Sequence, residues 1–585
     1  MTTFHNQVLF KLAQTIETAL QKKYPELKIN IEEIYKNIGE PPSLEMGHYA
    51  FACFPLAKAL KCAPPMVSKA LAEEIKPDQF IREAKVVGPY LNFFVSPEGL
   101  GDIVVQAALK GELFKQSLVE QKQKVMIEYS QPNTHKILHV GHMRNLCLGN
   151  ALVRLFRYAG HDVTATTFPG DVGTHVAKTL WYLKFHNKEP IPQENKGEWV
   201  GLIYSKAHCL LEDQVGTEHE AHNRAQLTEV LRQLEAKSGE YYEQWKETRL
   251  WSLELFNAAY GWADVHFDKW YFESEVDSAS LERAKKYQAE GKYVVSDGAV
   301  GMDLSDDKLG FCMMIKSDGN GMYATKDIEL AYRKFEEFHI DRNIYVVDKR
   351  QELHFKQVFK VLEKLSFPRA KDCYHLSYEF VELPDGAMSS RKGNIVPLME
   401  LINQMEAKIK TDYLERYKGE WSQEEINQTA SMVANGAIKY GMVKMDNSRK
   451  IVFDMAEWLK LEGETGPYLQ YVHARIHSLC EKLGYDGTSK ANWALLKTAQ
   501  EEALMIKLSH FNNIVKANMD QMRVSGLCAY LFDLGKLFNN FYVECPIGKA
   551  ETEELKKSRL LLAKAVGLTM EKGLAILGIP APKRM

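Results

Sequence analysis

The sequence predicts a multidomain α/β protein, and two observations support that fold class. Between Val125 and Phe168 the pattern runs strand, helix and strand, which is a βαβ unit and implies a parallel sheet. From about residue 400 to the end, the apolar residues keep helical spacing. The chain of 585 residues is long enough for roughly three or four domains.

The first domain is expected at 1–112 as a small α/β unit. Apolar residues from Val8 to Leu20 recur at helical spacing, and Pro64-Pro65 begins another helix. The run from Val86 to Val95 predicts a strand that is broken by a turn. A polar, charged connector follows this domain.

The second domain begins with the βαβ unit. Val125–Tyr129 is strand-like, Gly141–Ala159 has an apolar helical face and ends at Gly160, and Val163–Phe168 is the next strand. Such a unit predicts a Rossmann-type nucleotide-binding domain with a parallel sheet.

That domain is expected to span 113–400 with a long interruption. The stretch at about 180–320 is rich in charged and aromatic residues, and we expect it to be mostly helical and inserted between the two halves of the domain. A helix at Asp327–Phe338 and a strand at Asn343–Val347 then resume the α/β pattern.

The C-terminal part is predicted to be all helical. We expect a helical region at 401–455 and a helical domain at 456–585. The second of these contains a helix that begins at Gly466-Pro467, with proline in its first turn.

The bulk composition excludes several classes of protein. The net charge is −3, so a nucleic-acid partner would be held by local patches rather than by a uniformly basic surface. The nine cysteines form no C-x-x-C pair, which argues against a zinc ribbon and against a disulfide framework and is typical of a reducing cytoplasm. No apolar run is long enough to cross a membrane, and the first ten residues do not resemble a signal peptide.

The most informative residues are His139, Gly141 and His142, which open the helix after the first strand of the βαβ unit. A helix start offers free N–H groups and the positive end of the helix dipole to phosphate, and glycine lets phosphate approach the backbone. Far downstream, a small polar loop could close over a triphosphate from the other side. We call it the signature loop, and it consists of Met388, Ser389, Ser390, Arg391 and Lys392.

Together these segments resemble the two signatures of class I aminoacyl-tRNA synthetases, His-x-Gly-His and Lys-Met-Ser-Lys-Ser. The preceding run Ser130–Lys136 is similar to that of arginyl-tRNA synthetases in particular. Members of that family often lack the second lysine of the loop, here Ser390, and carry a lysine just before the histidines, here Lys136. The resemblance therefore implies that Lys136 supplies positive charge to the ATP phosphates.

The resemblance also implies a pocket for arginine. Tyr323-Ala324-Thr325-Lys326-Asp327 resembles a Tyr-x-Thr-x-Asp motif of the family, so Asp327 and Tyr323 would face the guanidinium. Glu128, Asn133 and Gln351, with His139, would bind the rest of the amino acid. The residues alone leave simpler explanations open, a helix N-terminal carboxylate for Asp327 and a solvent-facing strand residue for Glu128. Their expected position at strand ends of an open α/β sheet favours the site.

Contacts with tRNA are implied at both ends of the chain. The N-terminal unit resembles the domain with which the family meets the tRNA elbow, and Asn92 could bind a flipped-out base there. The helix from Gly466 resembles the start of the family's anticodon-binding domain, in which Tyr468 and Tyr471 could stack on unpaired bases. Core packing is the alternative for both tyrosines, and we expect it to hold for at least one.

The activity implied is ATP-dependent formation of arginyl-adenylate, followed by transfer to the terminal adenosine of tRNA(Arg). The implied partners are L-arginine, ATP as its Mg²⁺ complex, and tRNA, in a cytoplasmic monomer. No protein metal site and no membrane contact are expected. The alternatives are a small-molecule nucleotidyltransferase, which would leave the flanking domains without a purpose, and an RNA-binding protein without activity, against which an intact ATP site argues.

Overall fold

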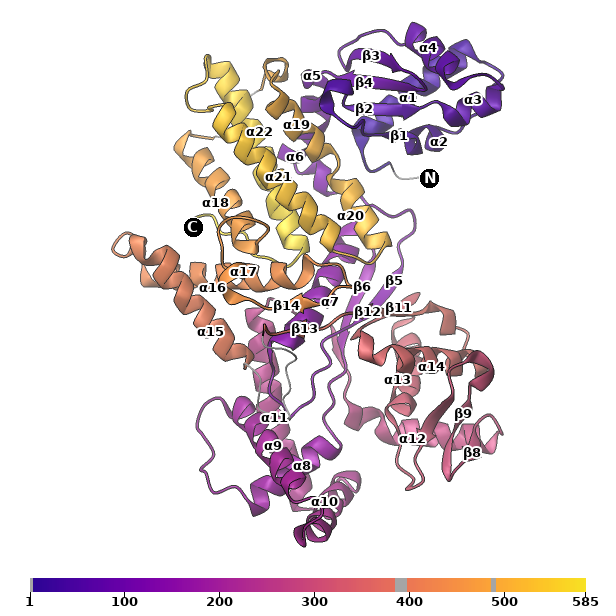
Figure 1. Ribbon diagram of the computed structural model, residues 1–585, viewed down its shortest axis with the longest axis vertical. Helices are drawn as coiled ribbons and strands as arrows, with labels where there is room; N and C mark the ends of the chain where they lie inside the picture. Colours follow the sequence, from indigo (N-terminus) through magenta and orange to yellow (C-terminus); the bar gives the residue numbers. More distant parts are fainter. Residues whose placement is uncertain (1–3, 385–396, 486–490) are drawn as a thin grey trace.

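The computed structural model describes residues 4–384, 397–485 and 491–585. The molecule is elongated, with the N-terminal unit and the C-terminal helices at one end and two inserted lobes at the other (Figure 1). A parallel sheet lies between them. The multidomain α/β class predicted from the sequence is confirmed.

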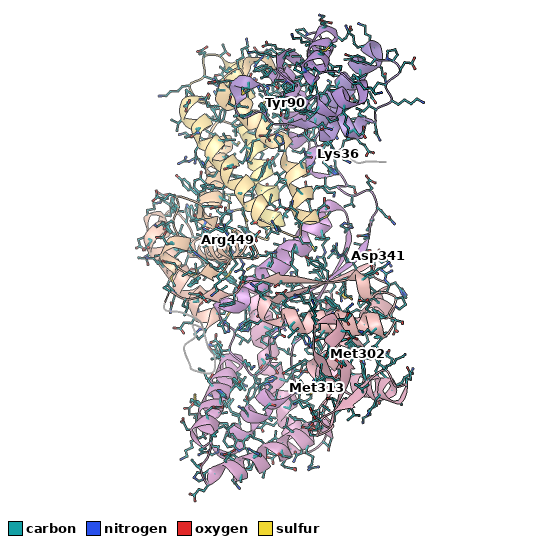
Figure 2. The ribbon with its side chains drawn as sticks, turned by 45° about the vertical axis from the view of Figure 1, so that its right-hand side comes forward. Lys36, Tyr90, Met302, Met313, Asp341 and Arg449 are labelled. Carbon is teal, nitrogen blue, oxygen red and sulfur yellow. The ribbon has the colours of Figure 1, made fainter. Side chains whose placement is uncertain are left out.

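The N-terminal unit is a four-stranded antiparallel sheet covered by helices. Its strands lie in the order β1 (Ile38–Gly39), β2 (Tyr49–Ala52), β4 (Tyr90–Val95) and β3 (Ile81–Val87). Its main helices are α1 (Gln7–Lys23), α2 (Ile31–Lys36), α3 (Phe54–Leu60) and α4 (Pro64–Glu74), and α5 (Pro97–Leu100) and α6 (Gln106–Leu109) lead out of it. The predicted helices and the strand broken by a turn are both present, and Gly88 occupies that turn with φ of 56°. Tyr90 marks this unit in Figure 2.

The central sheet has five parallel strands in the order β12 (Cys373–Tyr378), β11 (Arg342–Asp348), β5 (Lys124–Glu128), β6 (Asp162–Thr167) and β7 (Lys269–Trp270). Helix α7 (Val140–Ala159) connects β5 to β6 and ends at Gly160, which has a left-handed φ of 111°. Helices α13 (Tyr323–Phe338) and α14 (Glu352–Lys364) flank β11. This is the predicted Rossmann-type arrangement.

The inserted segment forms two lobes. Helices α8 (Thr174–Phe185), α9 (Lys196–Asp213), α10 (His219–Glu235) and α11 (Glu240–Trp262) make the first, and α12 (Glu273–Ala289) begins the second. The second lobe also contains an antiparallel sheet of β10 (Phe311–Ile315), β9 (Ala299–Asp303) and β8 (Val294–Ser296). Figure 2 marks it at Met302 and Met313. The insertion is mostly helical, as expected, and this small sheet was not foreseen because its strands are too short to show a clear period.

The C-terminal part is helical, as predicted, apart from one short strand. It comprises α15 (Leu398–Ile409), α16 (Gln423–Val443), α17 (Met455–Trp458), α18 (Gly466–Lys482), α19 (Ala499–Ser509), α20 (Phe511–Asp520), α21 (Ser525–Glu544) and α22 (Glu553–Ile576). The strand β14 (Ile451–Val452) pairs in parallel with β13 (Val381–Glu382) of the preceding domain.

Helix α7 joins the sheet to the C-terminal helices (Figure 1). Buried Arg144 on α7 donates to the backbone oxygens of Asp446 and Arg449, which follow α16 (Figure 2). At the upper end, Glu502 on α19 accepts hydrogen bonds from Arg82 at 2.7 Å and contacts His48 at 3.1 Å, which ties the N-terminal unit to the helical domain. Among the described residues, no helix is long and apolar enough to span a membrane.

Candidate active site

Two histidine side chains cap the start of α7 by accepting backbone N–H groups there. The Nδ1 atom of His139 accepts the N–H of Gly141, and the Nδ1 atom of His142 accepts the N–H of His139, each at 3.1 Å. An Nδ1 atom that accepts a hydrogen bond places the ring proton on Nε2 when the ring is neutral. Among the described residues, neither Nε2–H group has a hydrogen-bond partner, so each is left to donate.

Both rings are neutral at physiological pH. Burial lowers the pKa of His142 to about 4, and the neighbouring Lys136 and Arg350 charges add to this effect. Burial, with His142 and Arg350 nearby, holds the pKa of His139 well below its ordinary value. The helix start thus offers neutral hydrogen-bond donors beside the positive end of the helix dipole.

The loop between β5 and α7 is held in a fixed shape. Ser130 and His135 have left-handed φ values of 53° and 59°. The fully buried His135 ring contacts the hydroxyl of Thr248 at 2.8 Å, and the backbone N–H of His135 donates to the hydroxyl of Ser252 at 2.9 Å. Both partners lie on α11, so the insertion fixes the loop that leads to His139.

Lys136 lies beside the two histidines. Its Nζ atom is 5.3 Å from the ring centre of Tyr204 on α9. The positive charge is close enough to contribute to the lowered pKa values of both His142 and His175. Lys136 thus lies near His142, and the exchange of a loop lysine for this upstream lysine stays a prediction.

The signature-loop residues Met388, Ser389, Ser390, Arg391 and Lys392 lie outside the described residues. The described chain resumes beside the helix start, since Pro397 forms a backbone bridge with His139 and the N–H of Leu398 donates to the oxygen of Leu138 at 2.9 Å.

Glu128 ends β5 with its side chain in the core. It is 2% exposed and forms an ion pair with Lys334, whose side chain is fully buried on α13. The Nζ atom of Lys334 also lies 4.4 Å from the ring centre of Tyr345. Tyr345 is on β11 and pairs with Glu128 on the neighbouring strand β5. The alternative of a solvent-facing strand residue was wrong, and the carboxylate of Glu128 already has a cationic partner inside the protein.

Asp327 lies in the second turn of α13, because that helix begins at Tyr323 rather than at Asp327. The alternative of a carboxylate at the N-terminus of a helix was therefore wrong for this residue. Its Oδ2 atom contacts Nε2 of His354 at 2.5 Å. Burial alone would lower the pKa of His354, but the Asp327 carboxylate raises it above its ordinary value. Gln351 precedes His354 by one helical turn and is exposed.

Asn133 and the acidic residues meet at the turn after β6. Asn133 bridges to Gly170, and a side chain at Gly170 would lie 2.3 Å from the Oδ1 atom of Asn133 and 3.5 Å from the carboxyl carbon of Glu273. Glu273 is 7% exposed and lies 3.4 Å from Lys326. Tyr323 is 64% exposed, so its side chain is available to a ligand.

Glu273 has an unusual ionisation. Burial raises its pKa to about 7, because the nearby Lys326 only partly offsets burial and the Asp171 and Asp327 charges. Sequence reasoning missed this residue, together with Lys334, His354 and Arg350. Lys334 falls within the helix predicted at Asp327–Phe338, so its position relative to Asp327 was a usable signal. His354 lies outside any predicted helix and Glu273 belongs to the insertion, so neither had such a signal.

The predicted tRNA-contacting residues differ in exposure. Asn92 is 2% exposed on β4 and donates to the oxygen of Met46 at 2.8 Å, so its side chain is not at the surface to bind a base. Tyr468 is 8% exposed and accepts from Asn539 at 2.9 Å, as core packing predicts. Tyr471 instead lines an open cavity of about 510 Å³, where Arg475 lies over the rings of Tyr471 and Tyr542.

Comparison with known proteins covers the whole length of the chain. The family model for class I (R) tRNA synthetase catalytic domains matches residues 104–455, that for the DALR anticodon-binding domain matches 469–585, and that for the arginyl-tRNA synthetase N-terminal domain matches 11–95. An arginine–tRNA ligase of Bdellovibrio bacteriovorus is 54% identical over 99% of the chain and 100% of its own length. One from Clostridium botulinum is 33% identical over 98% of the chain and 99% of its own length. The solved arginyl-tRNA synthetase of Thermus thermophilus superposes with a TM-score of 0.78 at 27% identity, covering 98% of this chain and 99% of that one.

Proposed function

Since the chain belongs to the arginyl-tRNA synthetase family, we propose that the start of α7, Lys136 and the acidic pocket around Asp327 together perform arginine–tRNA ligation. The carboxylate of arginine attacks the α-phosphate of ATP, so that arginyl-adenylate forms and pyrophosphate leaves. The arginyl group then passes to a ribose hydroxyl of the terminal adenosine of tRNA(Arg), the 2′-OH in class I enzymes. The observation that carries the proposal is the start of α7, where two neutral histidines and the Lys136 charge lie together.

Catalysis here needs no nucleophilic side chain. The Nε2–H groups of His139 and His142 donate to phosphate oxygens, and the helix N-terminus and Lys136 offset the negative charge that grows on the leaving pyrophosphate. Neutral rings keep this role constant across physiological pH. Met388, Ser389, Ser390, Arg391 and Lys392 complete the enclosure of the phosphates in this proposal.

The amino-acid pocket recognises a cation through acids that are not fully satisfied by the protein. One oxygen of Asp327 is held by His354, which leaves the other to accept guanidinium N–H groups, with the exposed Tyr323 beside it. Asn133, Gln351 and His139 bind the α-amino and carboxyl ends. Glu128 is buried and its carboxylate pairs with Lys334, so we propose that it supports the pocket and does not contact the amino acid directly.

Magnesium is proposed to arrive bound to ATP. Among the described residues, no group of three His, Cys, Asp or Glu side chains is placed to hold a metal ion. When bound to the nucleotide, Mg²⁺ would neutralise part of the phosphate charge.

The cavity at Tyr471 is proposed to hold an unpaired base of the tRNA anticodon. Two tyrosine rings and the guanidinium of Arg475 provide the stacking surfaces that single-stranded nucleic acids bind. Asn92 would serve the elbow only if its side chain left its buried position on β4, an inner strand of the N-terminal sheet. The enzyme is proposed to act as a cytoplasmic monomer.

The decisive experiment is aminoacylation of total tRNA with each of the twenty amino acids. Charging with arginine alone is expected. If no amino acid is charged while ATP is consumed on a small molecule, a nucleotidyltransferase would replace this proposal. If neither reaction occurs but tRNA binds, the chain would be an RNA-binding protein.

A further inference from the structure

Helix α9, in the insertion, packs directly against the backbone of the Lys136 segment. Gly201 on α9 makes this contact possible, since a side chain there would lie 2.7 Å from the nitrogen of Ile137 and 2.9 Å from the carbonyl carbon of Lys136. Real Cβ atoms do not approach backbone so closely, so any larger residue at 201 must displace the helix or the segment.

The same face of α9 also supports the side chain of Lys136. Tyr204 follows Gly201 by three residues, close to one helical turn, and is only 5% exposed. The Nζ atom of Lys136 lies 5.3 Å from the centre of its ring, which is a cation–π contact. Backbone and side chain of Lys136 are thus both placed by one helix.

The position of this segment determines the position of the phosphate-binding groups. Ile137 and Leu138 connect Lys136 to His139 and are 4% and 5% exposed. The oxygen of Leu138 accepts the N–H of Leu398, where the described chain resumes. A shift at Lys136–Ile137 would therefore be passed to His139 and to the start of α15.

We propose that Gly201 and Tyr204 are positioning residues for adenylate formation, and that through them α9 holds Lys136 and the start of α7 in the geometry that binds the ATP phosphates. The inference rests on the proposed role of Lys136. It assigns to the insertion a part in the first reaction, in addition to any contact with tRNA.

The chain offers a matched control on the same helix. A side chain at Gly197 would be as crowded as one at Gly201, but against the oxygen of Trp251 and Cβ of Leu255 on α11. Gly197→Ala should therefore disturb the packing of α9 without pressing on Lys136. A comparison of the two variants separates loss of stability from loss of phosphate positioning.

The test is arginine-dependent ATP–pyrophosphate exchange in the full-length enzyme with tRNA present, alongside thermal unfolding. Gly201→Ala is expected to lower kcat by roughly 10- to 100-fold, with KM for arginine nearly unchanged, because a displacement of about 1 Å is enough for such a loss. Tyr204→Leu should raise KM for ATP several-fold, and Tyr204→Phe, which keeps the ring, should restore it.

Two results would overturn the inference. In the first, Gly201→Ala and Gly197→Ala lower the melting temperature by the same amount and also lose the same fraction of exchange activity. The other is Tyr204→Leu matching Tyr204→Phe in KM for ATP, a result that stands even if Gly201→Ala does not fold. Lys136→Met separates the proposed role of Lys136 from the inference about α9. If Lys136→Met exchanges ATP and pyrophosphate normally, the proposed role of Lys136 is wrong. If Lys136→Met is inactive while the Gly201 and Tyr204 variants are normal, only the inference about α9 is wrong.

Discussion

The Lys334–Glu128 ion pair should be among the most costly in the molecule to break. The Lys334 side chain is 0% exposed and that of Glu128 is 3% exposed, so neither charge is solvated. Lys334→Met would leave the carboxylate of Glu128 without its partner in a site that water does not reach. Loss of one partner of a buried pair typically costs about 3–5 kcal/mol, which corresponds to a fall of roughly 4–7 °C in the melting temperature of the catalytic domain matched at residues 104–455.

The assay is differential scanning calorimetry of Lys334→Met, Glu128→Met and the double variant. Because Met can fill much of the same volume, the double variant should recover most of the loss, and the two single costs should not add. Lys356→Met on α14 is the control, since its partner Glu352 is solvent-accessible and the pair contributes little. The reasoning fails if Lys334→Met has the same melting temperature as Lys356→Met. It also fails if the stability losses of Lys334→Met and Glu128→Met add up in the double variant.

Three further outcomes follow from the site. Because the pKa of His142 lies at about 4, kcat/KM for ATP should show no inflection from this ring between about pH 6 and 8, and an inflection near 6.5 that disappears in His142→Asn would contradict the neutral tautomer. Because the pKa of Glu273 is raised to about 7, its ionisation destabilises the fold progressively as pH rises from about 4.5 through 7; in denaturant unfolding Glu273→Gln should therefore gain up to about 3 kcal/mol relative to the parent between pH 5 and 8, and a pH-independent difference would refute this. Tyr471→Ala should raise KM for tRNA roughly tenfold and leave KM for arginine unchanged, whereas an equal loss in both would show a structural role.

The elements that the sequence predicts well are those with a strong local signal. The βαβ unit has a strand with an apolar centre, a long helix that a glycine ends, and a second strand rich in β-branched residues, and Gly160 adopts the left-handed conformation expected there. The strands β8 to β10 were missed because runs of three to five residues do not show a period.

The candidate site was predictable where residues form a recognisable pattern at a helix start. His139 and His142 are such residues, because they follow a strand and open a helix. The ion pair of Glu128 was not predicted, since lysine is ordinarily solvated and Lys334 is fully buried. Lys334 lies seven positions after Asp327, so both lie on one face of α13. This spacing could have predicted that Lys334 points toward the same side of the helix as Asp327. The burial of Asn92 depends on how β4 pairs with β2 and β3, which no local pattern reveals.

The most direct test of the account compares arginine with citrulline, its uncharged isostere, in ATP–pyrophosphate exchange by the parent enzyme and by Asp327→Asn. If Asp327 receives the guanidinium, the substitution should lower kcat/KM for arginine by roughly 100-fold or more, as expected when a charge-assisted hydrogen bond is lost, and should change the value for citrulline far less. An Asp327→Asn enzyme that uses arginine as well as its parent and still rejects citrulline would contradict the assignment of the arginine pocket.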